Sequence, residues 1–138
     1  MFKRIFFAGL TSSIFGALIS IAYFSVFKYS PLAVDFTEKA SYLYLLSFNL
    51  GIGMSTCLLY FILIKLLKKE NITSFIVGFL LSGVSISIAL LFMFKVDPEL
   101  KFTNENSELF KDFYYYILAP VSFFPVLSWF TFKPIFIK

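Results

Sequence analysis

Four long stretches without a charged residue dominate this sequence. They cover residues 5–27, 42–64, 72–94 and 113–132, and they are 23, 23, 23 and 20 residues long. An α-helix needs about 20 mostly apolar residues to cross the hydrocarbon core of a bilayer. Inside lipid, the backbone N–H and C=O groups of a helix find their partners within the same segment. The four stretches therefore predict four transmembrane helices.

The composition of the chain excludes the simplest alternatives. Hydrophobic residues make up 59% of the chain and charged residues 14%, whereas a soluble domain has about 45–50% apolar and about 25% charged residues. Runs of consecutive apolar residues, such as 58–64, do not alternate with polar residues as the strands of a membrane β-barrel do. We therefore expect an all-α, polytopic membrane protein whose single domain covers residues 1–138.

The charges between the helices predict their orientation, because lysine and arginine concentrate on the cytoplasmic side of membrane proteins. Seven of the 12 basic residues, with one acid, lie at the two termini and after the second helix. Segments 28–41 and 95–112 carry the other five basic residues and seven acids. We expect two helical hairpins, with both termini cytoplasmic and loops 28–41 and 95–112 external. The preference for lysine over arginine is typical of AT-rich genomes and favours a bacterial cytoplasmic membrane.

Several classes of chemistry are excluded by missing residue types. The chain has no histidine and one cysteine, which excludes imidazole metal sites, Ser-His and Cys-His catalysis, and an internal disulfide. None of the four stretches contains the acid or base that proton relays place inside a membrane. The basic residues flank apolar segments and form no face for nucleic acid. We expect no enzymatic activity, no cofactor, no metal and no nucleic-acid partner.

Small and polar residues inside the stretches are the candidates for function within the membrane. Asn49 is the strongest polar group, and glycine or serine at helical spacing is typical of closely packed membrane helices. Two prolines interrupt the fourth stretch, where each removes a backbone donor. Each of these residues can serve helix packing, which is the interpretation we favour, or can line a path for a solute or ion. The candidates are Asn49, Gly53, Thr56, Gly78, Ser82, Ser85, Pro120 and Pro125.

The longest external loop is rich in acids, and we expect it to contact a partner protein. Its five acids stand against three lysines and are Asp97, Glu99, Glu105, Glu108 and Asp112. Aromatic residues at the two ends of the fourth stretch, Tyr114, Tyr115 and Tyr116 at one end and Trp129 at the other, fit the aromatic belts that lie at membrane interfaces.

Two hypotheses for function follow from these features. The first is a non-enzymatic accessory or assembly subunit of a larger membrane complex, with the lipid bilayer and other membrane subunits as its partners. Its support is the absence of catalytic groups, the surplus of small residues on the helices and the acidic loop. The alternative is a small homo-oligomeric channel or transporter for a small solute or ion, with Asn49 and the proline break lining its path.

Overall fold

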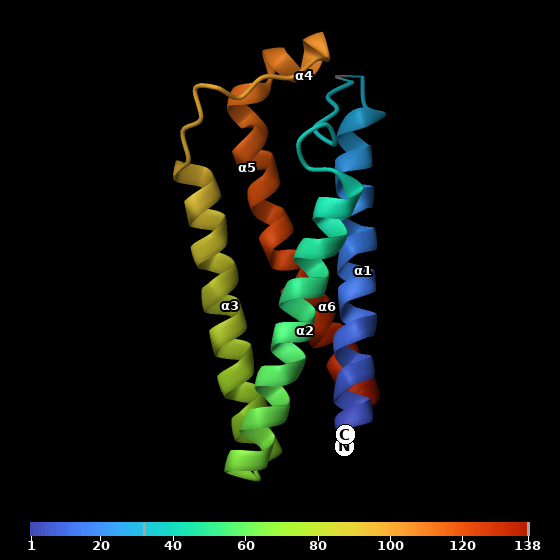
Figure 1. Ribbon diagram of the computed structural model, residues 1–138, viewed down its shortest axis with the longest axis vertical. Helices are drawn as coiled ribbons and strands as arrows, with labels where there is room; N and C mark the ends of the chain where they lie inside the picture. Colours follow the sequence, from blue (N-terminus) through green and yellow to red (C-terminus); the bar gives the residue numbers. More distant parts are fainter. Residues whose placement is uncertain (32, 138) are drawn as a thin grey trace.

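The computed structural model describes residues 1–31 and 33–137 and contains four helices long and apolar enough to cross a membrane. The first three are continuous: α1 (Phe2–Lys28), α2 (Tyr42–Leu67) and α3 (Glu70–Phe94). The fourth span covers Lys111–Phe136. Successive spans run in opposite directions, and both ends of the chain lie at the same end of the molecule (Figure 1). The prediction of an all-α protein with four membrane-length helices is confirmed.

The fourth span is built from several short helical pieces instead of the single helix expected over 113–132. A short helix, α4 (Glu105–Leu109), and a 3-10 turn, η1 (Lys111–Phe113), lead into α5 (Tyr114–Leu118). A 3-10 segment, η2 (Ala119–Phe123), then connects α5 to α6 (Phe124–Phe136). Pro120 and Pro125 are the second residues of η2 and α6. Because proline lacks an N–H and sterically disfavours a continuous α-helix through its position, the span changes geometry there.

The connection between α2 and α3 is shorter than the charged segment between the uncharged stretches 42–64 and 72–94. Both helices extend past the uncharged stretches, because long charged side chains at a helix end can reach the membrane surface. Only Lys68 and Lys69 remain between the helices, and Lys68 makes the turn in the left-handed conformation, with φ of 54°. At its other end, α2 is capped by Ser41, whose Oγ accepts a 3.2 Å hydrogen bond from the Tyr44 backbone N–H.

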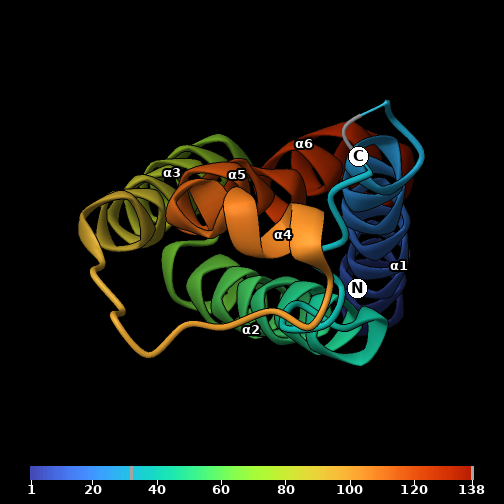
Figure 2. The same ribbon diagram turned by 90° about the horizontal axis from the view of Figure 1, so that it is seen from above.

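The spans pack unequally. Helix α1 packs closely along α2 and α6, whereas α3 packs less extensively, against η2 and α2 to a similar extent. From their short connection, α2 and α3 diverge towards the opposite end of the molecule (Figure 1). Seen from above, α3, α5 and α6 form one row, and α2 lies opposite this row beside α1 (Figure 2).

Two groups of buried side chains form the core, one near each end of the bundle. The group near the termini comprises Ile5, Ala8, Cys57, Tyr60, Val77, Leu81, Val126 and Trp129. The group near the opposite end comprises Phe24, Val34, Phe36, Ala40, Leu45, Phe102, Tyr114, Leu118 and Val121.

The prediction that Tyr114 and Trp129 belong to interfacial belts is wrong, because both are buried inside the protein at 5% and 2% exposure. Trp129 packs on the ring of Tyr60, with 5.9 Å between the ring centroids. Burial in the core places both side chains away from the headgroups that a belt residue contacts.

Candidate functional site

Asn49 lies in a closed seam where α1, α2 and α6 meet. Its Nδ2 donates to Ser20 Oγ at 3.2 Å and to the Leu45 carbonyl oxygen at 2.9 Å. A Cβ at Gly16 would overlap Asn49 Oδ1, so the absence of a side chain there leaves room for the amide. Asn49 is fully buried, and its Oδ1 accepts no hydrogen bond from the described residues. This geometry is that of a polar bond between packed membrane helices.

Gly53 brings α2 close to α1 one turn further along the same seam. A Cβ at Gly53 would overlap Ser13 Oγ and would lie 3.1 Å from the Gly9 carbonyl oxygen. Ser13 Oγ in turn donates to the Gly9 carbonyl at 2.6 Å, which satisfies the hydroxyl within α1. Small residues let two helix backbones approach closely and gain dispersion contacts. Gly53 therefore serves packing between α1 and α2.

The candidates on α3 contact the fourth span. A Cβ at Gly78 would lie 3.0 Å from the Phe130 ring of α6, so this glycine makes room for an aromatic side chain. Ser85 is buried, and its carbonyl oxygen accepts a 3.1 Å hydrogen bond from Ser122 Oγ. The Ser85 hydroxyl itself has no partner among the described residues. Ser82 is half-buried on the same helix.

The proline break is joined to α3 through Ser122, which lies in η2. Ser122 Oγ donates both to the Ala119 carbonyl at 2.7 Å and to the Ser85 carbonyl. Pro120 is exposed and Pro125 is buried. Asn49 lies in the seam between α1 and α2, whereas the segment with Pro120 contacts α3. Asn49 and the proline break are therefore in separate helix contacts.

Thr56 borders a groove between the diverging helices α2 and α3. The groove has a volume of about 350 Å³, and we call it the α2–α3 groove. It is lined by Gly51, Ile52, Ser55, Thr56, Leu59, Val77, Leu80, Leu81 and Val84. The Thr56 hydroxyl donates to the Ile52 carbonyl at 2.7 Å, so the lining presents mainly apolar surface. A Cβ at Gly51, or at Gly83 on α3, would meet no atom within 4 Å.

The two loops at the end opposite the termini fold together into a cap. Ser107 Oγ accepts from the Asp35 backbone N–H and donates to the Asp35 carbonyl oxygen, both at 2.9 Å. The Thr103 backbone N–H donates to the Glu38 carboxylate at 3.0 Å. Three rings pack edge to face or tilted beneath these bonds, those of Phe36, Phe102 and Tyr114. Hydrogen bonds and aromatic packing therefore join loop 95–112 to loop 28–41.

The five loop acids divide into two groups. Glu108 accepts hydrogen bonds from Lys111 Nζ at 2.8 Å and from the Phe102 backbone N–H at 2.7 Å, and these bonds lower the pKa of its carboxyl. Asp97 accepts from the Tyr115 hydroxyl and the Glu99 backbone N–H, both at 3.2 Å. Asp97 is nevertheless exposed, as are the remaining three acids, Glu99, Glu105 and Asp112. Glu108 and Asp97 thus have roles inside the cap that the sequence did not indicate.

No protein-family model, curated protein or solved structure matches this chain. Its function is therefore inferred from its own residues and their contacts.

Proposed function

We propose that this protein is a non-enzymatic accessory or assembly subunit of a larger membrane protein complex. In this proposal the α2–α3 groove receives a transmembrane helix of another subunit. The exposed acids of the cap, Glu105 and Asp112 among them, contact the external part of that partner. The chain lies in a bacterial cytoplasmic membrane as two hairpins, with both termini in the cytoplasm.

The α2–α3 groove is the observation that carries this proposal. Lipid tails are as apolar as leucine, so membrane helices associate through close packing and not through the hydrophobic effect. Close packing requires small residues on a surface that the chain leaves open. Gly51, which lines the groove, meets this requirement, because no atom lies within 4 Å of its Cβ position. Gly16, Gly53 and Gly78, in contrast, already contact side chains inside the bundle.

Co-purification of variants tests this proposal. Gly51→Leu should fill the groove without a clash inside the chain, because the Cβ position is open. Ala22→Leu is the matched control, since Ala22 is also an exposed small residue in a membrane helix but lies on α1. Tagged protein is extracted in mild detergent, and the recovered membrane proteins are identified by mass spectrometry.

We expect wild type and Ala22→Leu to recover the same partner and Gly51→Leu to lose most of it, with all three equally stable. A wild-type chain that is recovered as a lone monomer contradicts the proposal. Equal recovery of the partner by all three chains contradicts the assignment of the groove.

A small homo-oligomeric channel or transporter is the second candidate. The observation that favours it is a pair of buried side-chain oxygens without partners among the described residues, Asn49 Oδ1 and Ser85 Oγ. Ion or solute flux into liposomes that contain only this protein would support the channel. Loss of that flux in Asn49→Ala, with unchanged folding, would identify the path.

A further inference from the structure

A second cavity lies at the end of the bundle that holds both termini, away from the groove and the cap. It has a volume of about 330 Å³, at the lower end of the range of small-molecule sites, about 300–1,000 Å³. It is lined by Met1, by α1, α2 and the start of α3, and by the residue after α6. The lining residues are Met1, Arg4, Ile5, Tyr60, Ile64, Glu70 and Ile137.

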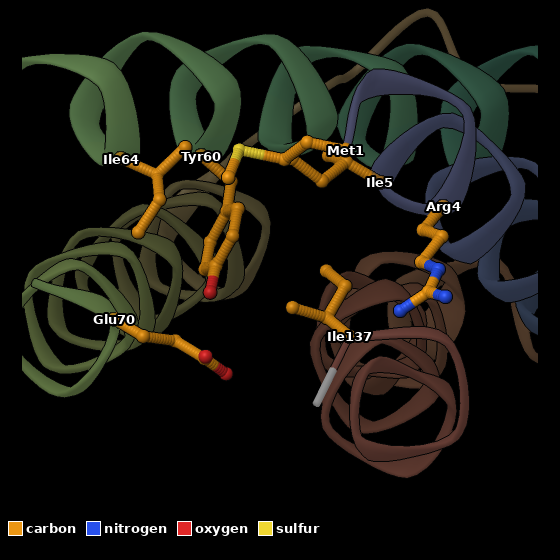
Figure 3. A pocket seen from close by; sticks show the side chains of 7 residues that line it. All are labelled: Met1, Arg4, Ile5, Tyr60, Ile64, Glu70 and Ile137. Carbon is orange, nitrogen blue, oxygen red and sulfur yellow. The ribbon is translucent and has the colours of Figure 1, made fainter. Parts of the chain in front are cut away.

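Polar groups from three helices converge on this cavity. Figure 3 shows the Tyr60 hydroxyl and the Glu70 carboxylate on one side of the cavity and the Arg4 guanidinium on the other side, next to Ile137. The apolar side chains of Ile5, Ile64 and Ile137 form the remaining wall. Such a combination of a few polar groups with an apolar wall is typical of a site for an amphipathic molecule.

The charge balance of the cavity favours an anion. Lys133 Nζ lies 3.9 Å from a Glu70 carboxylate oxygen and donates a 2.6 Å hydrogen bond to Ser74 Oγ. Glu70 therefore already has a cation beside it. Within residues 1–31 and 33–137, Arg4 forms no ion pair and no side-chain hydrogen bond. A guanidinium presents parallel N–H donors that match the oxygens of a phosphate group.

The position of the cavity favours a phosphate that belongs to a lipid. The cavity lies at the boundary of two uncharged stretches. Ile5 is the first residue of the stretch 5–27, and Ile64 is the last residue of the stretch 42–64. Exposed lysines lie at the α2–α3 connection at this end of the molecule: Lys65, Lys68 and Lys69. Basic clusters beside membrane helices attract anionic headgroups, and basic pockets between such helices bind them. The apolar wall would then face the glycerol and upper acyl region of the same molecule.

We propose that this cavity binds the phosphate of one anionic phospholipid. Arg4 is the main contact, Tyr60 donates a hydrogen bond, and Lys133 balances the charge of Glu70. Tyr60 is placed for this role by its ring, which packs on Trp129 and lies 5.6 Å from Lys133 Nζ. The bound headgroup links α1, α2 and α3 at the end where they meet. This site is independent of the proposed α2–α3 interface.

Native mass spectrometry of the full chain tests the lipid site. The protein is purified in mild detergent and titrated with phosphatidylglycerol or with zwitterionic phosphatidylcholine. Arg4→Gln removes the main contact, and Lys3→Gln is the matched control, because it removes the same charge at the neighbouring position but does not line the cavity. We expect one tightly retained phosphatidylglycerol, with affinity about tenfold lower in Arg4→Gln, as for loss of a charged hydrogen bond. The control should stay within about twofold of wild type.

Two further arms complete the test. Tyr60→Phe keeps the ring that packs on Trp129 and removes the hydroxyl, together with its 3.4 Å contact to Ser74 Oγ. It should weaken retention less than Arg4→Gln. Glycerol phosphate, added in millimolar excess, should fail to displace the lipid. Three results would each overturn the proposal: equal retention of the two lipids, equal loss in Arg4→Gln and Lys3→Gln, or full displacement by glycerol phosphate, which would make a soluble phosphate the ligand.

Discussion

Two glycines of α2 that are only two residues apart meet opposite surroundings. Gly53 faces α1, and a Cβ there would overlap Ser13 Oγ and press on the Gly9 carbonyl oxygen, a backbone atom that cannot move alone. Gly51 faces the open α2–α3 groove, where a Cβ would meet nothing within 4 Å. The same substitution should therefore have opposite effects at the two positions.

Gly53→Ala should lower the free energy of unfolding by about 1–3 kcal/mol, as overpacking does in a close-packed interior. Gly51→Ala should leave it unchanged or raise it by about 0.5–1 kcal/mol, because alanine is the better helix former. Unfolding by a denaturing detergent, followed through the single tryptophan, measures both. A destabilisation of the same size in the two variants would contradict the close contact between α1 and α2 at Gly53.

At the scale of the elements, we expect ionised Glu108 to stabilise the cap. Hydrogen bonds from Lys111 and from the Phe102 backbone N–H hold the pKa of this carboxyl below its ordinary value. A carboxyl with a lowered pKa in the folded state adds stability above its unfolded pKa and loses it as the pH falls through the folded value. Since the ordinary value for glutamate is about 4.3, this contribution should be complete at neutral pH.

We expect Glu108→Gln to lower the unfolding midpoint of the purified protein at neutral pH. The difference from wild type should shrink as the pH falls below about 4.3 and the carboxyl becomes protonated. Thermal unfolding measured across this pH range checks the prediction, with the exposed Glu105→Gln as the control that removes the same charge. A constant difference at every pH would mean that ionisation of Glu108 does not support the cap.

The elements also show how much of the fold the sequence could predict. The four spans were predictable because uncharged stretches of this length form few structures other than membrane-spanning helices. The break at Pro120 was indicated as a kink, but the 3-10 segment and its bond from Ser122 to Ser85 depend on where α3 lies. The burial of Trp129 and Tyr114 was missed, because an aromatic residue near a helix end has the same local sequence whether it faces lipid or a neighbouring helix.

The candidate sites were predictable only in part, for the same reason. Asn49 and Gly53 were identified by their residue types, and their contacts are those of packing between helices. The α2–α3 groove and the cavity beside Arg4 arise from several helices at once, so spacing along one helix carries no signal for them. Glu108 differs from Glu105 only through the three-dimensional path of loop 95–112, which brings Lys111 and Phe102 to it.

For the whole molecule, the orientation in the membrane is a prediction from charge. Reporter fusions after Lys69, in the connection between α2 and α3, should be active on the cytoplasmic side. Fusions after Glu105, at the start of α4, should be active on the outer side. The connection between α2 and α3 and the helix α4 lie at opposite ends of the molecule, so one experiment addresses both sides (Figure 1). The reverse pattern would invert the orientation and place the Arg4 cavity in the outer leaflet.

Photo-cross-linking in native membranes tests the central claim, that the α2–α3 groove holds a helix of another protein. A photoreactive phenylalanine analogue at Leu80, which lines the groove, is compared with the same analogue at Leu18, an exposed position on α1. The account predicts one discrete adduct with a different membrane protein from position 80 and none from position 18. Adducts from position 80 with only lipid, or only with a second copy of this chain, would contradict it.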